Sequence, residues 1–239
     1  MSQTYIDFSQ VDTGDILLFS NLAEYAVGIQ LATGSKWNHA GIAIWVDRDL
    51  IFKFGVKAKL VNEKTKILCV LESNYDTKFD IYTQKETDGA RLTPIDAFMK
   101  RHTLIACRKI NVIRDDDFYA KTGSFMEKYS GTPYRRNFFR ISLGYAGIST
   151  FNKKDTICSE LCAKYLNHIG LISDAWLECN DSGTIMPSDF GMSQDIFSEG
   201  VFMQNKPIII MQRRNDCSMQ LLLVILIVVI IILLIMRGR

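Results

Sequence analysis

The chain has 239 residues with a formal net charge of +2, and 48% of its residues are hydrophobic. This length suits one large domain or two small ones. The nearly balanced charge, with no long basic run interleaved with aromatic residues, argues against a nucleic-acid-binding protein. Only four prolines occur, and no internal repeat or low-complexity linker divides the chain.

The six cysteines are scattered along the chain, which favours free thiols in a reducing compartment over a disulfide framework. No CxxC pair occurs, and none of the three histidines lies at ligand spacing from a pair of cysteines. We therefore expect no zinc cluster, no other metal site and no cofactor.

Hydrophobic periodicity predicts an α+β domain with helices packed on a sheet rich in antiparallel pairs. Strands are expected at residues 15–19, 39–46, 51–55, 67–72 and 104–112, with weaker candidates at 79–82 and 90–92 and a last strand at 201–211. Helices are expected at residues 21–32, 94–101, 115–131, 155–170 and 187–190. Thr93 is expected to cap the second helix, and the acidic run from Asp115 favours the start of the third.

The C-terminal part of the chain has a different character. Leu221 to Met236 is an unbroken run of 16 apolar residues, flanked by arginines on both sides. As a helix it would span about 24 Å, and adding residues 217–220 brings it close to the length that crosses a bilayer. The N-terminus has no signal-peptide pattern. We therefore predict a domain at residues 1–212, a juxtamembrane linker at 213–220 and a transmembrane tail anchor at 221–236.

A tail anchor of this kind makes the lipid bilayer a partner of the protein. It predicts a single-pass membrane protein whose N-terminal domain faces the cytosol, in agreement with the free cysteines.

The segment from Asp155 to Cys162 predicts the first turn of an amphipathic helix, with Asp155 as N-cap and Gly170 as its C-terminal stop. Cys158 falls in that first turn, where unpaired backbone N–H groups and the helix dipole stabilise a thiolate. Cys158 is thus a candidate nucleophile, although a cysteine on a helix is more often a small core residue. Cys162, one turn deeper, is expected to be such a core residue.

A thiolate nucleophile needs a general base, and the base needs an orienting partner. His168 lies about 15 Å from Cys158 along the same helix and is too far to serve. His102 ends a basic helix and is expected to be solvated, which leaves His39 as the base. Glu72, at the end of an apolar strand, is the first candidate for the orienting carboxylate; the weaker ones are Asp15, Asn74 and Asp76.

Four short motifs occur in a characteristic order: Gly14–Phe19, Asn38–Ile42, Leu71–Glu72 and Ile157–Leu161. Together they resemble the circularly permuted branch of the NlpC-type, papain-like cysteine hydrolases. That branch includes bacterial YiiX-like proteins, poxviral relatives and, more distantly, lecithin–retinol acyltransferase. In that branch the histidine precedes the cysteine, as it does here. The segments 131–134 and 187–190 also look like the family's Tyr-bearing loop and its Pro-Asp turn.

The resemblance implies a permuted papain-like fold in which Cys158 attacks a carbonyl carbon, His39 moves the proton and Glu72 holds the imidazole. The backbone N–H of Cys158 would be one oxyanion donor. Tyr134, and the loop residues Trp37 and Asn38 before His39, are the candidate substrate contacts. The family often has an acidic residue after the tyrosine, whereas Arg135 and Arg136 follow here, so the charge preference for substrate stays open.

The expected function is a membrane-anchored thiol hydrolase or acyltransferase that cleaves an amide or ester bond in a lipid or lipid-modified substrate. A cysteine peptidase or isopeptidase is one alternative, and a non-catalytic viral membrane structural protein that retains the fold is another. The poxviral relatives and the tail anchor favour a large DNA virus as the source, with a host or virion membrane as the location.

Overall fold

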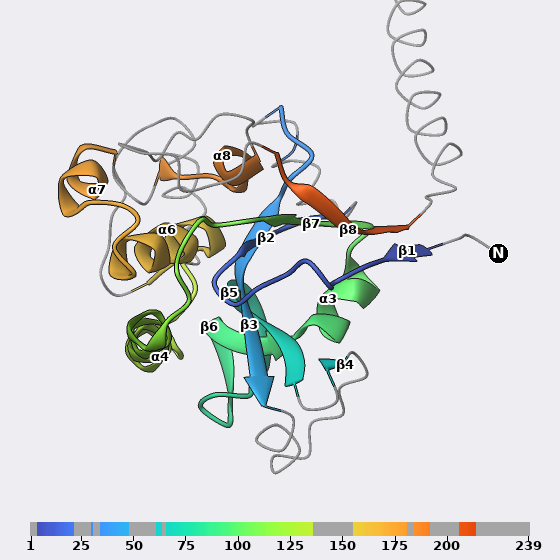
Figure 1. The fold of residues 1–239 in the computed structure, drawn as a ribbon, viewed down its shortest axis with the longest axis horizontal. Helices are drawn as coiled ribbons and strands as arrows, with labels where there is room; N and C mark the ends of the chain where they lie inside the picture. The colour runs from blue at the N-terminus through green and yellow to red at the C-terminus, as the bar shows by residue number, and fades with distance from the viewer. Residues whose placement is uncertain are drawn as a thin grey trace, which may run out of the picture.

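The computed structural model describes residues 4–21, 30, 34–47, 61–63, 66–135, 155–180, 184–191 and 206–213. They form a mixed α+β fold around one antiparallel sheet, in which neighbouring strands follow the order β1-β8-β7-β2-β3-β5-β4, while β6 pairs with β5 (Figure 1). The strands are β1 Thr4–Ile6, β2 Ile16–Ser20, β3 His39–Asp47, β4 Val61–Glu63, β5 Lys66–Asp80, β6 Lys85–Pro94, β7 Leu104–Arg108 and β8 Ile208–Arg213.

Helices pack on both faces of this sheet. They are α3 Ile95–Arg101, α4 Asp116–Tyr129, α6 Cys158–His168, α7 Asp174–Asn180 and α8 Pro187–Gly191. In Figure 1, α4, α6 and α7 gather on one side, and α3 lies on the other. The start of α4 confirms its prediction, because the Asp115 carboxylate accepts a hydrogen bond from the backbone N–H of Phe118 at 3.0 Å.

The alternation of side chains along the strands explains why both faces are covered. Ile16 and Leu18 of β2 belong to the apolar core beneath α4 and α6, whereas Leu17 and Phe19 belong to the core beneath α3. Because successive side chains of a strand point to opposite faces, a strand that is apolar throughout must be buried on both.

Several predicted boundaries are wrong. The strand expected to end at Glu72 continues to Asp80, because β6 pairs with it beyond a register shift between Asn74 and Lys78. β7 ends at Arg108, short of residue 112, because the next residues bind Asp15: the Lys109 ammonium at 2.7 Å and the Ile110 backbone N–H at 3.1 Å. This ion pair also gives Asp15 a structural role.

The expected cap of α3 is also wrong. Thr93 belongs to β6, its hydroxyl makes no capping bond, and Pro94 takes the N-cap position. β8 begins at Ile208, and residues 201–205 lie outside the described part of the chain, as does the predicted strand at 51–55. Of the predicted helix at 21–32, the structure describes Asn21, which is not helical, and Gln30, which is.

A loop at residues 131–134 runs against β6 and leads toward α6. The backbone N–H of Ala90 donates to the Thr132 carbonyl at 2.8 Å, and the N–H of Gly131 donates to the Ala90 carbonyl at 2.7 Å. Gly89 permits this contact, since its φ is 132° and an added Cβ would lie 2.0 Å from the Thr132 carbonyl oxygen.

Within the described residues, no helix has the length and apolar character needed to cross a membrane. The predicted anchor at residues 221–236 lies outside that part of the chain.

Candidate active site

His39 opens β3, where this strand pairs with the end of β2, opposite Phe19. Its ring is 9% exposed and lies among other rings, with centroids 5.6 Å from Phe19 and 6.1 Å from Phe98. Packing of this kind restricts the imidazole to one orientation, as a general base requires.

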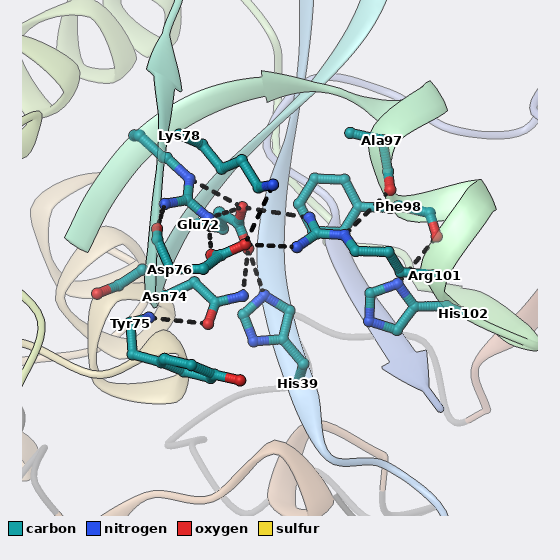
Figure 2. Close-up of polar contacts among 12 residues, drawn as sticks. His39, Glu72, Asn74, Tyr75, Asp76, Lys78, Ala97, Phe98, Arg101 and His102 are labelled. Carbon is teal, nitrogen blue, oxygen red and sulfur yellow. Dashed lines mark hydrogen bonds and ion pairs between the residues drawn. The ribbon is translucent and has the colours of Figure 1, made fainter. Parts of the chain in front are cut away.

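Glu72 lies inside β5, fully buried, and its side chain reaches His39. The two side chains meet at 2.8 Å between Oε2 of Glu72 and Nε2 of His39 (Figure 2). Gly41 lets β3 and β5 approach here, because an added Cβ would lie 2.5 Å from a Val70 methyl and 3.2 Å from the Leu71 carbonyl oxygen. The sheet therefore brings together the base and the orienting carboxylate that the sequence predicts.

Cys158 is the first residue of α6, and Ile157 before it is the N-cap, with no side-chain capping bond. The prediction that Asp155 caps this helix is wrong, because its carboxylate accepts instead from Nε of Arg135 at 2.9 Å. Cys158 nevertheless sits where the free N–H groups of a helix start stabilise a thiolate. Cys162 is fully buried in the core beneath α6, as predicted.

Three segments hold the start of α6 in place. The Ser73 hydroxyl of β5 donates to the Thr156 carbonyl at 3.1 Å, and the backbone N–H of Arg135 donates to the same carbonyl at 3.2 Å. The Ser159 hydroxyl donates to the Ile185 carbonyl at 2.5 Å. The position of the thiol is thus determined by the sheet, by the loop after α4 and by the segment before α8.

The Cys158 thiol lies near enough to the His39 ring for each group to shift the pKa of the other, while Nε2 of the ring faces Glu72. Burial of the thiol acts to raise its pKa. The overall pKa is nevertheless lowered, by the charge and hydrogen bond of His39 and by the backbone N–H groups of Ala40 and Ser159. Burial also acts to lower the pKa of the His39 ring, but Cys158 and Glu72 raise that pKa to about 9. Both shifts favour the thiolate–imidazolium form of the pair.

Glu72 itself is held in its ionised form. Burial disfavours the carboxylate, but the hydrogen bond and charge of His39, together with Arg91 and Arg101, lower the pKa of Glu72 to about 2. Arg91 faces Glu72 from β6 and donates to its Oε1 from Nε at 3.2 Å and from Nη2 at 3.0 Å. Asp76 in turn accepts from Arg91 and from Arg101, and Figure 2 shows the contact between Asp76 and Arg101.

His102 is not solvated, contrary to the sequence-based expectation. It is only 4% exposed, and its ring is stacked on His39 with centroids 6.3 Å apart and an interplanar angle of 14°. Burial and the nearby charge of His39 lower the pKa of His102 to about 4, so it is neutral at physiological pH. His168 lies elsewhere, with Nε2 at 2.8 Å from the Ser124 hydroxyl of α4.

The candidate substrate residues differ in exposure. Tyr134 is half-buried, pairs with Thr156 just before α6, and has its ring centroid 6.2 Å from that of Tyr75. Trp37 is buried against Gly191 of α8. Asn38 is buried too, and its side-chain amide donates to the Asn21 carbonyl at 3.1 Å. A substrate role for these three residues stays a prediction.

Arg135 does not face a substrate. Its guanidinium is fully buried and, besides Asp155, binds Glu160 of α6 at 2.7 Å. Arg135 therefore does not set the preference of the site for a charged substrate. Arg136 lies outside the described residues.

Sequence reasoning missed Arg91 and Tyr75. One signal for Arg91 was available: it stands between Ala90 and Leu92 in a weak strand candidate. A charged side chain inside a buried strand requires a charged partner, and Glu72 is directly opposite. Nothing in the sequence marks Tyr75, which follows Asn74 at the point where the pairing of β5 shifts register.

In the ranges that the structure describes, no group of three or more His, Cys, Asp and Glu side chains is arranged to hold a metal ion.

Comparison with known proteins gives similarity to solved structures alone. No family model matches the sequence, and no curated protein matches it. Among solved structures, the metalloprotein YiiX from Escherichia coli O157:H7 is similar over 67% of each chain, with 20% sequence identity and a TM-score of 0.45. This is a limited similarity of fold.

Proposed function

We propose that this protein is a thiol hydrolase or acyltransferase of the permuted papain-like type that cleaves an amide or ester bond. Cys158 is the nucleophile, His39 the acid–base and Glu72 the residue that orients the imidazole. The observation that carries the proposal is the 2.8 Å bond between the buried side chains of His39 and Glu72, with the buried Cys158 thiol near enough to His39 for the two to shift each other's pKa.

The geometry accounts for each step of such a reaction. The Cys158 sulfur bonds to the carbonyl carbon, and the negative charge moves to the carbonyl oxygen, near the N–H groups of the helix start. In enzymes with an oxyanion hole, one such donor contributes about 2.7–4 kcal/mol. When the C–N or C–O bond breaks, His39 gives its proton to the leaving group. A water molecule, or an acceptor hydroxyl or amine in a transferase, then gives a proton to His39 as it releases the acyl group from sulfur.

Glu72 supports both proton transfers. Its carboxylate accepts from Nε2 of His39 and so directs Nδ1 toward the sulfur. The negative charge of Glu72 also stabilises the imidazolium that exists before the attack and after the acyl transfer. The fully buried position of Glu72 strengthens this effect, because little solvent screens the pair.

We assign the substrate to acyl lipids or lipid-modified molecules, because the apolar run at residues 221–236 would hold the site next to a bilayer. In this arrangement the catalytic domain is cytosolic and the anchor is the single membrane span. The catalytic domain comprises residues 1–212, and the juxtamembrane linker at 213–220 joins it to the anchor.

A substrate screen tests the proposed function. The intact protein and Cys158→Ala are compared on libraries of acyl lipids, thioesters and peptides, with release of acid or amine measured by mass spectrometry. We expect turnover of an acyl-lipid or thioester substrate by the intact protein and none by the variant. Cleavage of peptides alone would replace the lipid assignment by a peptidase. Equal biological activity of the two proteins would overturn catalysis by Cys158.

Deletion of the chain after Arg214 tests the anchor. Without the apolar run, the protein is expected to leave the membrane fraction, because its favourable insertion energy of several kcal/mol is lost. The measurement is fractionation in high salt, which removes proteins held only by charge, with the intact chain as the control. A truncated protein that still sediments with membranes under these conditions contradicts a tail anchor.

A further inference from the structure

The two oxygens of the Glu72 carboxylate have different partners. Oε2 is bonded to His39, whereas Oε1 accepts both Nε and Nη2 of Arg91. Arg91 is fully buried and faces Glu72 across the β5–β6 pairing. It lies on the far side of Glu72 from the imidazole, so it contacts neither the thiol nor the place where a substrate would react.

We propose that Arg91 is a positioning residue of this active site, which acts through Glu72 to keep His39 charged and Cys158 ionised. The inference rests on the proposed function in taking Cys158 as the nucleophile. It adds a residue that neither the motif resemblance nor the comparison with YiiX indicates.

The geometric part of the argument concerns rotation of the carboxylate. Two N–H groups of one planar guanidinium hold Oε1, so the carboxylate of Glu72 cannot turn without losing both bonds. Arg91 is itself fixed, because its Nη1 donates to the Thr87 carbonyl at 3.2 Å and its guanidinium binds Asp76. Oε2 is therefore presented to Nε2 of His39 in one orientation.

The electrostatic part concerns the charge of Glu72. A carboxylate with no exposed surface takes up a proton unless a positive group compensates it. If a neutral side chain replaced Arg91, Glu72 would bind a proton more readily. His39 would then lose the negative charge that stabilises its imidazolium. The Cys158 thiolate would then lose its own counter-ion.

The other charged groups around Glu72 do not replace Arg91. Arg101 of α3 comes only within 4.0 Å of Oε1, and its Nη1 is committed to Asp76 at 3.0 Å. Lys78 is paired with Asp76 at 3.7 Å on the exposed side. His102, also on the α3 side, stacks against His39 and is neutral at physiological pH.

The test measures alkylation of Cys158 by iodoacetamide as a function of pH, read by peptide mapping, in the full-length protein, Arg91→Gln and Arg91→Lys. This readout requires no substrate. Arg91→Gln is expected to shift the acid limb of the alkylation rate profile of Cys158 to higher pH by at least one unit. At a given pH on that limb, Cys158 would then react at least tenfold more slowly. Arg91→Lys is expected to show a smaller shift in the same direction, since an ammonium keeps the charge but not the paired N–H groups.

Arg108→Gln is the matched control, because Arg108 is an equally buried arginine on β7 of the same sheet and the Glu72 carboxylate has no bond to it. Its profile is expected to match that of the unaltered protein. A folded Arg91 variant with an unchanged profile, or the same shift in Arg108→Gln, overturns the inference. Circular dichroism reports folding, and Arg91→Lys decides the outcome if Arg91→Gln does not fold.

The same experiment separates this inference from the proposed function. Cys158 of the unaltered protein is expected to react faster than the other five cysteines near neutral pH. If it does not, the nucleophile assignment fails, whatever Arg91 does. If it does and the Arg91 variants are unshifted, only the role of Arg91 fails.

Discussion

Replacing His39 with asparagine is expected to slow alkylation of Cys158 about 100-fold at pH 7 and to reduce turnover by about 10⁴-fold or more. The thiol is buried, and burial is the largest influence on its pKa and favours the neutral form. Without the imidazolium, only the backbone N–H groups of Ala40 and Ser159 still lower the pKa of the thiol against the effect of burial. The pKa of Cys158 should then rise to its ordinary value or above, and the reactive thiolate becomes rare.

His168→Asn is the control for this substitution. His168 is on the same helix as Cys158 but is bonded to Ser124 of α4, so its loss should leave both rates unchanged. The measurements are the alkylation rate of Cys158 by peptide mapping and kcat/KM on any substrate that the screen identifies. Unaltered alkylation in His39→Asn would mean that the histidine does not stabilise the thiolate.

The pH profile of the unaltered protein follows from the same pair. Alkylation should rise as Cys158 ionises and remain high above pH 9, because the thiolate persists after His39 loses its proton at about that pH. Turnover should fall above pH 9, since protonation of the leaving group requires the imidazolium. The two profiles therefore separate on the basic side.

Replacing Gly89 with alanine is expected to destabilise the fold by about 3 kcal/mol or more. The φ of 132° at Gly89 is one that residues with a Cβ rarely adopt, and the new methyl would lie 2.0 Å from the Thr132 carbonyl oxygen and 2.8 Å from the Tyr134 nitrogen. Backbone strain and overpacking each cost about 1–3 kcal/mol, and here the neighbours are backbone atoms. Relief requires the loop at residues 131–134 to move away from β6.

Gly131→Ala separates strain from collision, because Gly131 also has a positive φ of 81° but no heavy atom lies within 4 Å of an added Cβ. It is expected to cost about 1–2 kcal/mol. Urea unfolding followed by circular dichroism measures both variants. Because this loop leads to Arg135 and Thr156, Gly89→Ala should also slow alkylation of Cys158 in the folded fraction. Equal stabilities of the two variants would show that the loop adjusts freely.

The amino-acid sequence was sufficient to predict the parts of the candidate site that depend on local pattern. A polar residue at the start of an apolar strand, a carboxylate after an apolar run and a cysteine in the first turn of a helix identified His39, Glu72 and Cys158. Local rules also predicted that α4 starts at the acidic run from Asp115, and the structure adds that the Asp115 carboxylate caps this helix.

Tertiary structure alone decided the residues whose surroundings come from distant segments. Asp155 lost its expected cap position to an ion pair with Arg135, twenty residues earlier in the chain. His102 is buried because α3 packs over Phe19 and His39, which a helical pattern of seven residues does not reveal.

By itself, the sequence predicts a type of chemistry, the three side chains that would perform it, and an apolar run that would bring it to a membrane. The tertiary structure decided which partners those side chains have. Arg91 faces Glu72 only because β6 pairs with β5 in one register, and a slip of one residue would turn either side chain to the opposite face. Strand register is a property of the whole sheet, and it places the ion pair of Glu72 and Arg91 behind His39.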